Sequence, residues 1–271
     1  MKKIAWSLLL LLAFGALAVY LYSAREKHEP ALPTVPVVTQ PVTPALPVGP
    51  QIRYPLAPPS LEKPLPALDL SDAAVRNSLD ELSLGKTLIG LLQLQDFVRR
   101  VVATVDNLPR GKAALRLMPV KPAPGRFLVD RAGEGFAISG ANAARYAPYV
   151  KLAEAVDANK LVALYIHLYP LFQQAYRELG YPKGYFNDRL VEVIDHLLAA
   201  PELQAPILLV QPKVFYLFAD PELEARSAGQ KILMRMGVEN AQKIKGMLRE
   251  IRAELTRQAV PESKQGAASG R

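Results

Sequence analysis

The chain of 271 residues contains no cysteine, only three histidines and a single tryptophan. Without cysteine it has no disulfides, no zinc–thiolate site and no thiol nucleophile. One of the histidines, His28, precedes the region expected to fold, so a metal site built on imidazole ligands is not expected. We therefore expect no cofactor and no metal.

Motifs of common active sites are also missing. The sequence has no G-x-S-x-G, no G-x-G-x-x-G and no Walker phosphate loop. The glycines in "RAGEGFAISGANA" lack the strand-to-helix frame of a phosphate loop and indicate a hairpin turn instead. We assign no catalytic residue, and whether the protein is an enzyme stays open, with the balance against it.

Charge is absent from "IAWSLLLLLAFGALAVYLY", which runs from Ile4 to Tyr22. A helix of that length rises about 28 Å, close to the ~30 Å hydrocarbon core of a bilayer. Two lysines precede the segment, which favours a cytoplasmic N-terminus (residues 1–3) and an exported C-terminal body. We predict a single-pass anchor with the lipid bilayer as its partner. The alternative is a signal peptide cleaved near Ala16-Leu-Ala18.

Residues 23–66 have little charge and much proline. Half of the 24 prolines of the chain lie between Pro30 and Pro66. Proline fixes φ and removes a backbone donor, so neither a helix nor a sheet ladder is expected there. We predict a disordered linker that acts as a stalk or spacer, and a docking tract for a proline-binding partner is the alternative.

Residues 67–258 are expected to form one compact, mainly α domain with a small β hairpin or short edge strands, followed by a disordered tail at 259–271. The hairpin is placed at 126–129 and 136–138, after the basic loop "RGKAALRLMPVKPAPGR". The segment 206–219 is expected to be extended, with a short buried helix as the alternative. Helices are expected at 71–82, capped by Ser71, and at 91–108, 145–157, 158–179 (kinked at Pro170), 188–199, 221–236 and 240–257.

The helix expected at 188–199 carries the densest group of reactive side chains. Glu192 and His196 are four residues apart, so a carboxylate–imidazole pair is available on one stripe. Asp195 lies about 100° round the helix from His196, because successive residues turn by that angle. The other reading is the solvated face of an ordinary helix, with Asp188 complementing its N-terminus. We retain Asp188, Arg189, Glu192, Asp195 and His196 as a candidate polar or binding cluster.

Eight of the eleven tyrosines lie between Tyr146 and Tyr216. Tyrosine is favoured in binding surfaces, but rings at helical spacing also fill a core. His167 lies on the same long helix, and we expect it to be partly buried and hydrogen-bonded. The candidate aromatic and basic surface consists of Arg145, Tyr146, Tyr149, Tyr169, Tyr176, Arg177, Tyr181 and Tyr185.

The last predicted helix has an apolar stripe flanked by cations at Lys243, Lys245, Arg249 and Arg252. Such a helix can lie on an acidic membrane or bind a partner, and docking on its own domain explains the stripe equally well. Six of the 33 Lys/Arg and three of the 25 Asp/Glu precede Ala67, which leaves 27 against 22 and a net charge of +5. This mild balance makes nucleic acid an improbable partner.

Four strings, "RYAPYV", "LYPLFQQAYRELGYPKGYFNDRLVEVIDHLLAAPE", "LVQPKVFYLFADPELEA" and "SAGQKILMRMGVENA", carry a family resemblance. They are similar to a proteobacterial family known as domain of unknown function number three thousand and fourteen. The resemblance spans about Ala67 to Leu255 and includes the N-terminal anchor and proline-rich stalk. It implies a protein anchored in the envelope of Gram-negative bacteria, with no established activity and no catalytic residues.

The leading hypothesis is a single-pass inner-membrane protein whose periplasmic domain binds an envelope protein or polymer. The alternative is an envelope enzyme, hydrolase-like, that uses Glu192 or Asp195 with His196. A weaker alternative is a cytoplasmic binder of nucleic acid or of a membrane surface. The sequence leaves the ligand and the oligomeric state undetermined.

Overall fold

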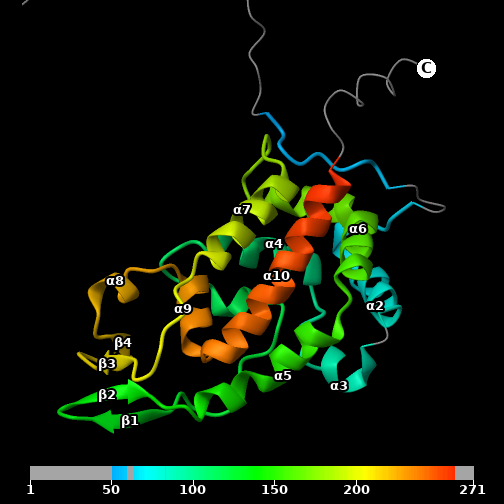
Figure 1. Ribbon diagram of the computed structural model, residues 1–271. Helices are drawn as coiled ribbons and strands as arrows, with labels where there is room; N and C mark the ends of the chain where they lie inside the picture. Colours follow the sequence, from blue (N-terminus) through cyan, green and yellow to red (C-terminus); the bar gives the residue numbers. More distant parts are fainter. Residues whose placement is uncertain (1–50, 60–63, 83, 260–271) are drawn as a thin grey trace, which may run out of the picture. The chain divides into compact units, whose positions relative to one another are not determined.

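The computed structural model describes residues 51–59, 64–82 and 84–259 (Figure 1). These residues belong to one compact unit, Gly49–Arg271. The predicted membrane segment at 4–22, most of the linker and most of the tail lie outside the described residues. Among the helices that are described, none combines the length and the apolar character needed to cross a membrane.

The described residues form nine α-helices, two short 3₁₀ turns and four strands, so the prediction of a mainly helical fold with a small sheet is confirmed. Their order is η1 (Leu68–Leu70), α2 (Asp72–Asp80), α3 (Gly85–Ile89), α4 (Phe97–Asn107), η2 (Leu115–Leu117), β1 (Val129–Ala132), β2 (Gly135–Ile138), α5 (Asn142–Ala155), α6 (Ala158–Glu178), α7 (Phe186–Leu198), β3 (Leu208–Val210), β4 (Leu217–Phe218), α8 (Pro221–Glu224), α9 (Ala228–Arg235) and α10 (Val238–Gln258).

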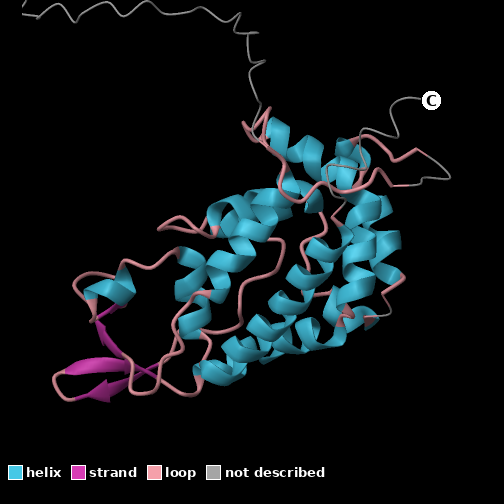
Figure 2. Ribbon diagram, turned by 45° about the horizontal axis from the view of Figure 1, so that its top comes forward, coloured by secondary structure: helices cyan, strands magenta, loops and turns pink. Residues whose placement is uncertain are grey.

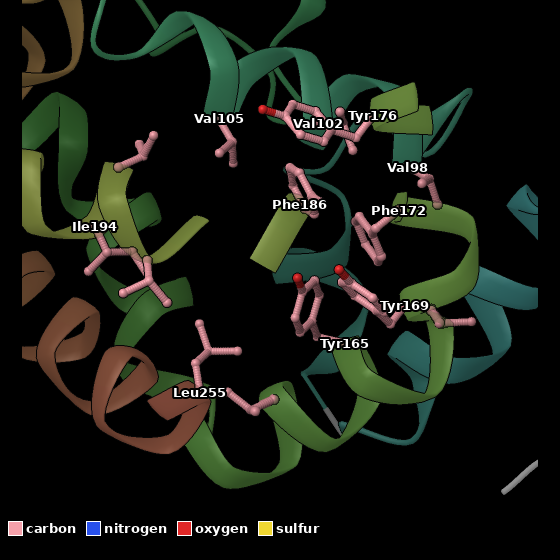
Figure 3. Close-up of a cluster of buried hydrophobic side chains, with 14 of the residues drawn as sticks. Val98, Val102, Val105, Tyr165, Tyr169, Phe172, Tyr176, Phe186, Ile194 and Leu255 are labelled. Atoms are coloured by element: carbon pink, nitrogen blue, oxygen red, sulfur yellow. The ribbon is translucent and has the colours of Figure 1, made fainter. Parts of the chain in front are cut away.

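The main core lies between α4, α6, α7 and α10, and it is rich in aromatic rings (Figure 3). Phe172 and Phe186 stack with ring centroids 5.9 Å apart, and Tyr165 tilts against Phe172 at 5.2 Å. Tyr176 stacks on Tyr181 at 4.5 Å. The rings that α6 presents at helical spacing therefore fill the core, where offset and edge-to-face pairs are favourable.

A smaller core lies against the antiparallel sheet, whose strand order is β1-β2-β3-β4. The strands are the magenta arrows of Figure 2. Leu209 and Phe218 are paired across β3 and β4 and pack on Met234 of α9. Arg235 lies beside the rings of Phe127 and Phe218, at 5.8 and 5.0 Å from their centroids. The hairpin is confirmed, and the open question at 206–219 is resolved in favour of strands.

Several predicted boundaries are wrong for local reasons. The helix expected from residue 91 begins at Phe97, because Asp96 has a left-handed φ of 52° and Asp72 accepts from the amides of Asp96 and Phe97. The first hairpin strand is 129–132 rather than 126–129, and the helix expected at 221–236 divides at Ser227 into α8 and α9. Ser71 starts α2, but its hydroxyl donates to the Leu68 carbonyl and caps no amide.

Residues 51–59, hereafter the strap, come from the segment expected to be linker. Leu56 is buried against the main core and pairs with Ala259 in an isolated antiparallel bridge. In Figure 1 the strap, in blue, crosses the end of the body away from the sheet. The folded body therefore extends N-terminally beyond Ala67.

Candidate functional site

Helix α7 carries the candidate cluster, and its polar side chains contact four different parts of the fold. The helix runs from Phe186 to Leu198 and buries Val191, Val193 and Ile194 against the core. Its remaining faces are polar because the sequence alternates these apolar residues with charged ones at helical spacing.

The first turn of α7 binds the strap. The Asp188 carboxylate accepts hydrogen bonds from the amides of Arg53 (2.9 Å) and Tyr54 (2.7 Å). The side-chain amide of Asn187, which is fully buried, donates to the Tyr54 carbonyl at 2.9 Å. The Tyr185 hydroxyl accepts from the Leu56 amide at 2.7 Å. Asp188 therefore serves another segment and not the amides of its own helix.

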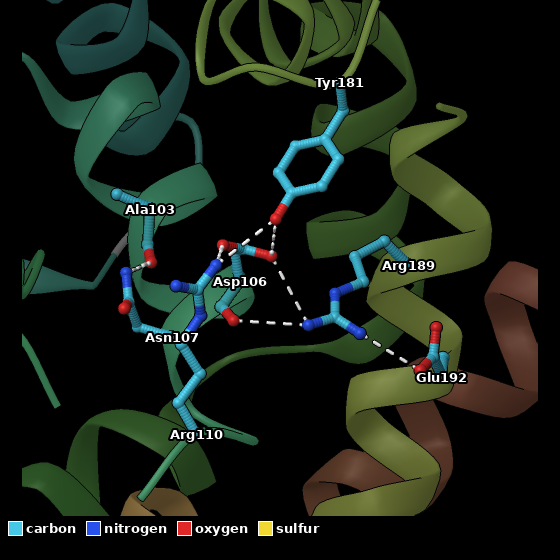
Figure 4. Close-up of polar contacts among 7 residues, drawn as sticks. All are labelled: Ala103, Asp106, Asn107, Arg110, Tyr181, Arg189 and Glu192. Carbon is cyan, nitrogen blue, oxygen red and sulfur yellow. Dashed lines mark hydrogen bonds and ion pairs between the residues drawn. The ribbon is translucent and has the colours of Figure 1, made fainter. Parts of the chain in front are cut away.

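A second face of α7 contacts Asp106, a buried residue near the end of α4 (Figure 4). Its carboxylate accepts from Arg110 Nη2 at 2.5 Å, from the Tyr181 hydroxyl at 3.1 Å and from Arg189 Nη2 at 3.3 Å. Arg189 also donates to the exposed carboxylate of Glu192 at 3.0 Å. The charge of Asp106 raises the pKa of Arg110, aided by their hydrogen bond. The network therefore ties α4, α7 and the turn before α7 together.

Asp195 and His196 contact residues outside that network. Asp195 forms an ion pair with Arg252 of α10 through both of its carboxylate oxygens. Arg252 Nε donates to Oδ1, and Arg252 Nη2 donates to Oδ2 at 3.1 Å. His196 Nε2 lies 2.8 Å from the hydroxyl of Ser227, the N-cap of α9, and the His196 carbonyl accepts from Gln230 at 2.9 Å. Among the described residues Glu192 and His196 are not hydrogen-bonded to each other, so their spacing on the helix does not produce a pair.

The candidate aromatic and basic surface is not one surface. Tyr169 and Tyr176 are buried, and burial raises the pKa of both hydroxyls above the ordinary value for tyrosine, so both hydroxyls stay protonated at neutral pH. Tyr169 donates to Gln173 at 2.8 Å. Tyr146, Tyr181 and Tyr185 are half-buried at the edge of the core, and Arg177 is exposed.

Arg145 and Tyr149 of α5 hold a loop. Arg145 donates to the carbonyls of Pro124 (2.9 Å) and Gly125 (3.1 Å), and the Tyr149 hydroxyl is placed 2.9 Å from the Lys121 carbonyl. Burial raises the pKa of the Tyr149 hydroxyl, which keeps it protonated and able to donate. Both residues act on backbone carbonyls of the segment between α4 and β1.

The cations of α10 mostly attach that helix to the body. Lys245 is buried and donates to the Ala200 carbonyl at 2.6 Å and to Glu202 at 3.0 Å. Lys243 pairs with Glu154 of α5 at 2.8 Å, and Arg252 pairs with Asp195. Arg249 remains exposed. Of the two readings of this helix, the contacts favour docking on its own domain.

Two surface cavities lie away from the candidate cluster. One, of about 310 Å³, is lined by residues of α2 and α6, including Lys160 and His167. His167 is exposed and makes no hydrogen bond within the part of the chain that the structure describes, so the expectation that it is buried and bonded is wrong. The other, of about 470 Å³, lies between α4, η2 and the end of α6. Neither includes a polar residue of α7.

Asp106 and the strap were missed by sequence reasoning. Asp106 has one available signal, since a carboxylate among Val101, Val102 and Val105 interrupts the apolar positions of its helix. The strap has none, because Arg53 and Tyr54 bond through their amides, which every residue other than proline possesses.

Comparison with known proteins adds a family and no activity. No curated protein and no solved structure matches the chain. In the described ranges no group of three or more His, Cys, Asp or Glu side chains is placed to hold a metal ion. A family model matches residues 97–252, which is more than half of the chain and spans α4 to α10. The chain therefore belongs to the family described as protein of unknown function (DUF3014).

Proposed function

We propose that this protein is a single-pass inner-membrane protein whose periplasmic body binds an envelope protein or polymer through its surface. The observation that carries the proposal is that the polar side chains of α7 bind other segments of the fold. Asp188, Asp195 and His196 each bind a different segment of the fold, and Glu192 pairs with Arg189. General acid–base catalysis requires such groups to converge on one bound substrate. Because these side chains hold the fold together and do not converge on one point, catalysis by them is poorly supported. Binding through the surface is therefore the better-supported role.

The apolar segment at 4–22 and the proline-rich linker support the anchoring part of the proposal. An anchored body with an extended linker can reach partners at a distance from the bilayer. The exposed apolar side chains of the loop between β3 and β4 offer one contact surface, since Val214 and Phe215 are each 78% exposed.

The first test is the orientation of the chain in the membrane. A reporter enzyme that is active only outside the cytoplasm is fused after Arg271 of the full-length chain. In a second protein the same reporter is inserted between Lys3 and Ile4, and the rest of the chain is kept. Activity of the first fusion and inactivity of the second support the proposed topology. The opposite pattern refutes it.

The second test is binding in the native envelope. The full-length chain is crosslinked in cells and purified under denaturing conditions, and crosslinked protein and cell-wall polymer are quantified. A Glu192→Gln/His196→Gln variant is the matched comparison, because an enzyme site at these residues is removed while the rest of the surface is intact. The proposal expects both chains to retain the same envelope component in the same chemical form. Cleavage of that component by the wild type and not by the variant would point to the enzyme alternative.

A further inference from the structure

The connection between α4 and β1 is long and has little regular structure. Between Asn107 and Val129 the described chain forms only the 3₁₀ turn η2 and an isolated antiparallel bridge of Val120 with Leu92. Connections longer than about 12–15 residues without their own secondary structure are uncommon in compact domains and are often functional. Here the segment 110–126, hereafter the basic loop, lies within the part of the chain that matches the family.

The basic loop is fixed to the body through its backbone carbonyls. Arg100 donates to the Arg116 carbonyl at 2.6 Å, and Thr104 donates to the Leu117 carbonyl at 3.1 Å. Further along, Tyr149 lies within hydrogen-bond distance of the Lys121 and Pro122 carbonyls, and Arg145 donates to Pro124 and Gly125. Because α4 and α5 bind the main chain, the backbone that carries the exposed side chains of the loop is held against the body.

Those side chains are cationic and apolar. The sequence from 107 to 129 contains five Lys/Arg and no Asp or Glu. Arg110 pairs with Asp106, but Lys112, Arg116, Lys121 and Arg126 are exposed, and no carboxylate among the described residues pairs with them. Leu115, at the 3₁₀ turn, is 72% exposed. An exposed leucine flanked by unpaired cations matches a surface that is both apolar and negatively charged.

The cavity beside the loop argues against an acidic peptide as the occupant. Leu117 lines this cavity together with two carboxylates, Asp96 and Glu178, and two guanidinium groups, Arg99 and Arg100, so the lining has no net positive charge to attract an acidic segment. The cations nearest to it are already engaged, Arg99 with Asp69 and Glu178 and Arg100 with carbonyls. A flat array of headgroups needs no such cavity, and Leu115 and the four unpaired cations are all exposed.

We propose that the basic loop is a contact site for acidic phospholipid headgroups, with Leu115 entering the interfacial layer of the bilayer. The inference rests on the proposed anchoring, which keeps the body near a membrane. Each cation close to an acidic bilayer contributes a factor of about five to binding, so removing three of them lowers binding by a factor on the order of a hundred, and reversing their charge lowers it further.

The absence of cysteine allows a direct test in the full-length chain. Leu115→Cys is labelled with an environment-sensitive dye, and the protein is added to vesicles of phosphatidylcholine alone or with about one-third phosphatidylglycerol. Flotation with the vesicles reports anchoring, whereas the dye reports the loop. We expect a blue-shifted emission only in the acidic vesicles, and a shift that is lost at high salt.

Two controls make the result specific. Lys112→Glu/Arg116→Glu/Lys121→Glu should abolish the shift, whereas Lys151→Glu/Lys183→Glu/Lys213→Glu, which changes the net charge equally at other exposed positions, should keep it. A dye at Arg177→Cys should stay in an aqueous environment. Flotation without a shift, an equal effect of the two triple variants, or a shift given only by duplex DNA or polyglutamate would each overturn the inference. Failure to float counts against the proposed anchoring instead.

Discussion

At the scale of single residues, Gly229 allows α9 to approach both α4 and α7. A Cβ at this position would lie 2.5 Å from Cδ2 of Leu197, which is buried, and 3.1 Å from the Leu108 carbonyl oxygen. The close approach also brings the Gly229 amide to the Leu108 carbonyl at 2.9 Å. Any side chain at residue 229 must therefore displace packed atoms.

We predict that Gly229→Ala lowers the free energy of unfolding by about 1–3 kcal/mol, the usual cost of an overpacked site. Gly246→Ala is the matched control, because Gly246 lies inside α10 with open space around it. This substitution should raise the free energy of unfolding by about 0.5–1 kcal/mol. Urea denaturation of both variants measures the difference, and equal effects would contradict the packing described for α9.

The two carboxylates that pair with Arg189 differ in burial, and their removal should differ accordingly. The side chain of Asp106 is 4% exposed, whereas that of Glu192 is 55% exposed. Asp106→Ala leaves Arg189 with only the exposed carboxylate of Glu192 and removes the acceptor of Arg110 and Tyr181, so we expect a loss of about 3–5 kcal/mol. Glu192→Ala removes a surface pair and should cost about 0–1 kcal/mol. If Glu192→Ala is the more damaging change, the network does not stabilise the fold as described.

At the scale of elements, the first turn of α7 holds the strap through hydrogen bonds that Asp188 accepts and Asn187 donates. Asp188→Ala removes the acceptor of the Arg53 and Tyr54 amides, while Asp195→Ala removes an ion pair two turns further along. We predict that hydrogen exchange at the amides of Arg53, Tyr54 and Leu56 accelerates in the first variant and is unchanged in the second. Fast exchange of these amides in both variants, or in neither, would show that Asp188 does not hold the strap.

The attachment of the small sheet to α8 and α9 should depend on pH through Glu224. Burial alone would raise the pKa of this carboxyl, but hydrogen bonds from Lys231 (2.8 Å) and the Phe218 amide (3.0 Å), with the charge of Lys231, lower it. A carboxyl whose pKa is lowered by folding stabilises the protein above its unfolded pKa of about 4.5. That contribution is lost as the pH falls through the lower, folded pKa.

Glu224→Gln should therefore be less stable than the wild type at neutral pH, and the gap should narrow steadily below about pH 4.5. The measurement is the free energy of unfolding of both proteins from neutral to acidic pH. A gap that is independent of pH would mean that the ionised carboxylate is not what stabilises this attachment.

The helices were predictable from the sequence wherever apolar periodicity and a stop signal agreed. The helix α6 ends where Gly180, with a φ of 116°, and Pro182 indicated. The start of α4 was not predictable, because Leu91 and Leu94 continue its periodicity and only the left-handed Asp96, bound by Asp72, ends the run. A contact between distant segments, such as that of Asp72 with the Asp96 amide, does not change the apolar periodicity of either segment, so the sequence pattern does not reveal it.

The candidate site was predictable in its residues and not in their partners. A helical wheel placed Glu192 and His196 on one stripe, but it cannot show that Arg189 and Ser227 lie closer to them. Side-chain partners are fixed by tertiary packing, here by α9 and by the buried Asp106. Spacing on one helix therefore predicted proximity and not chemistry.

At the scale of the whole molecule, the strap is the part of the body that directly follows residues 1–50 in the sequence. Leu56 pairs with Ala259, so the chain enters and leaves the described body at neighbouring positions. The basic loop and the apolar tip at Val214 and Phe215 are separate segments of the chain, and both carry exposed apolar side chains. The proposed anchor and the proposed contact surfaces are therefore carried by different segments.

The central claim is that an exported body acts through surface contacts and not through the acid–base residues of α7. Single cysteines at Leu115 and at Glu192, introduced into the full-length chain, are exposed in cells to a maleimide that does not cross the inner membrane. Labelling in cells is compared with labelling of the same chains purified in detergent. We predict that position 192 is labelled equally in both settings, whereas position 115 is protected in cells only. Absence of labelling at both positions in cells, or protection of 192 with free labelling of 115, would contradict the account.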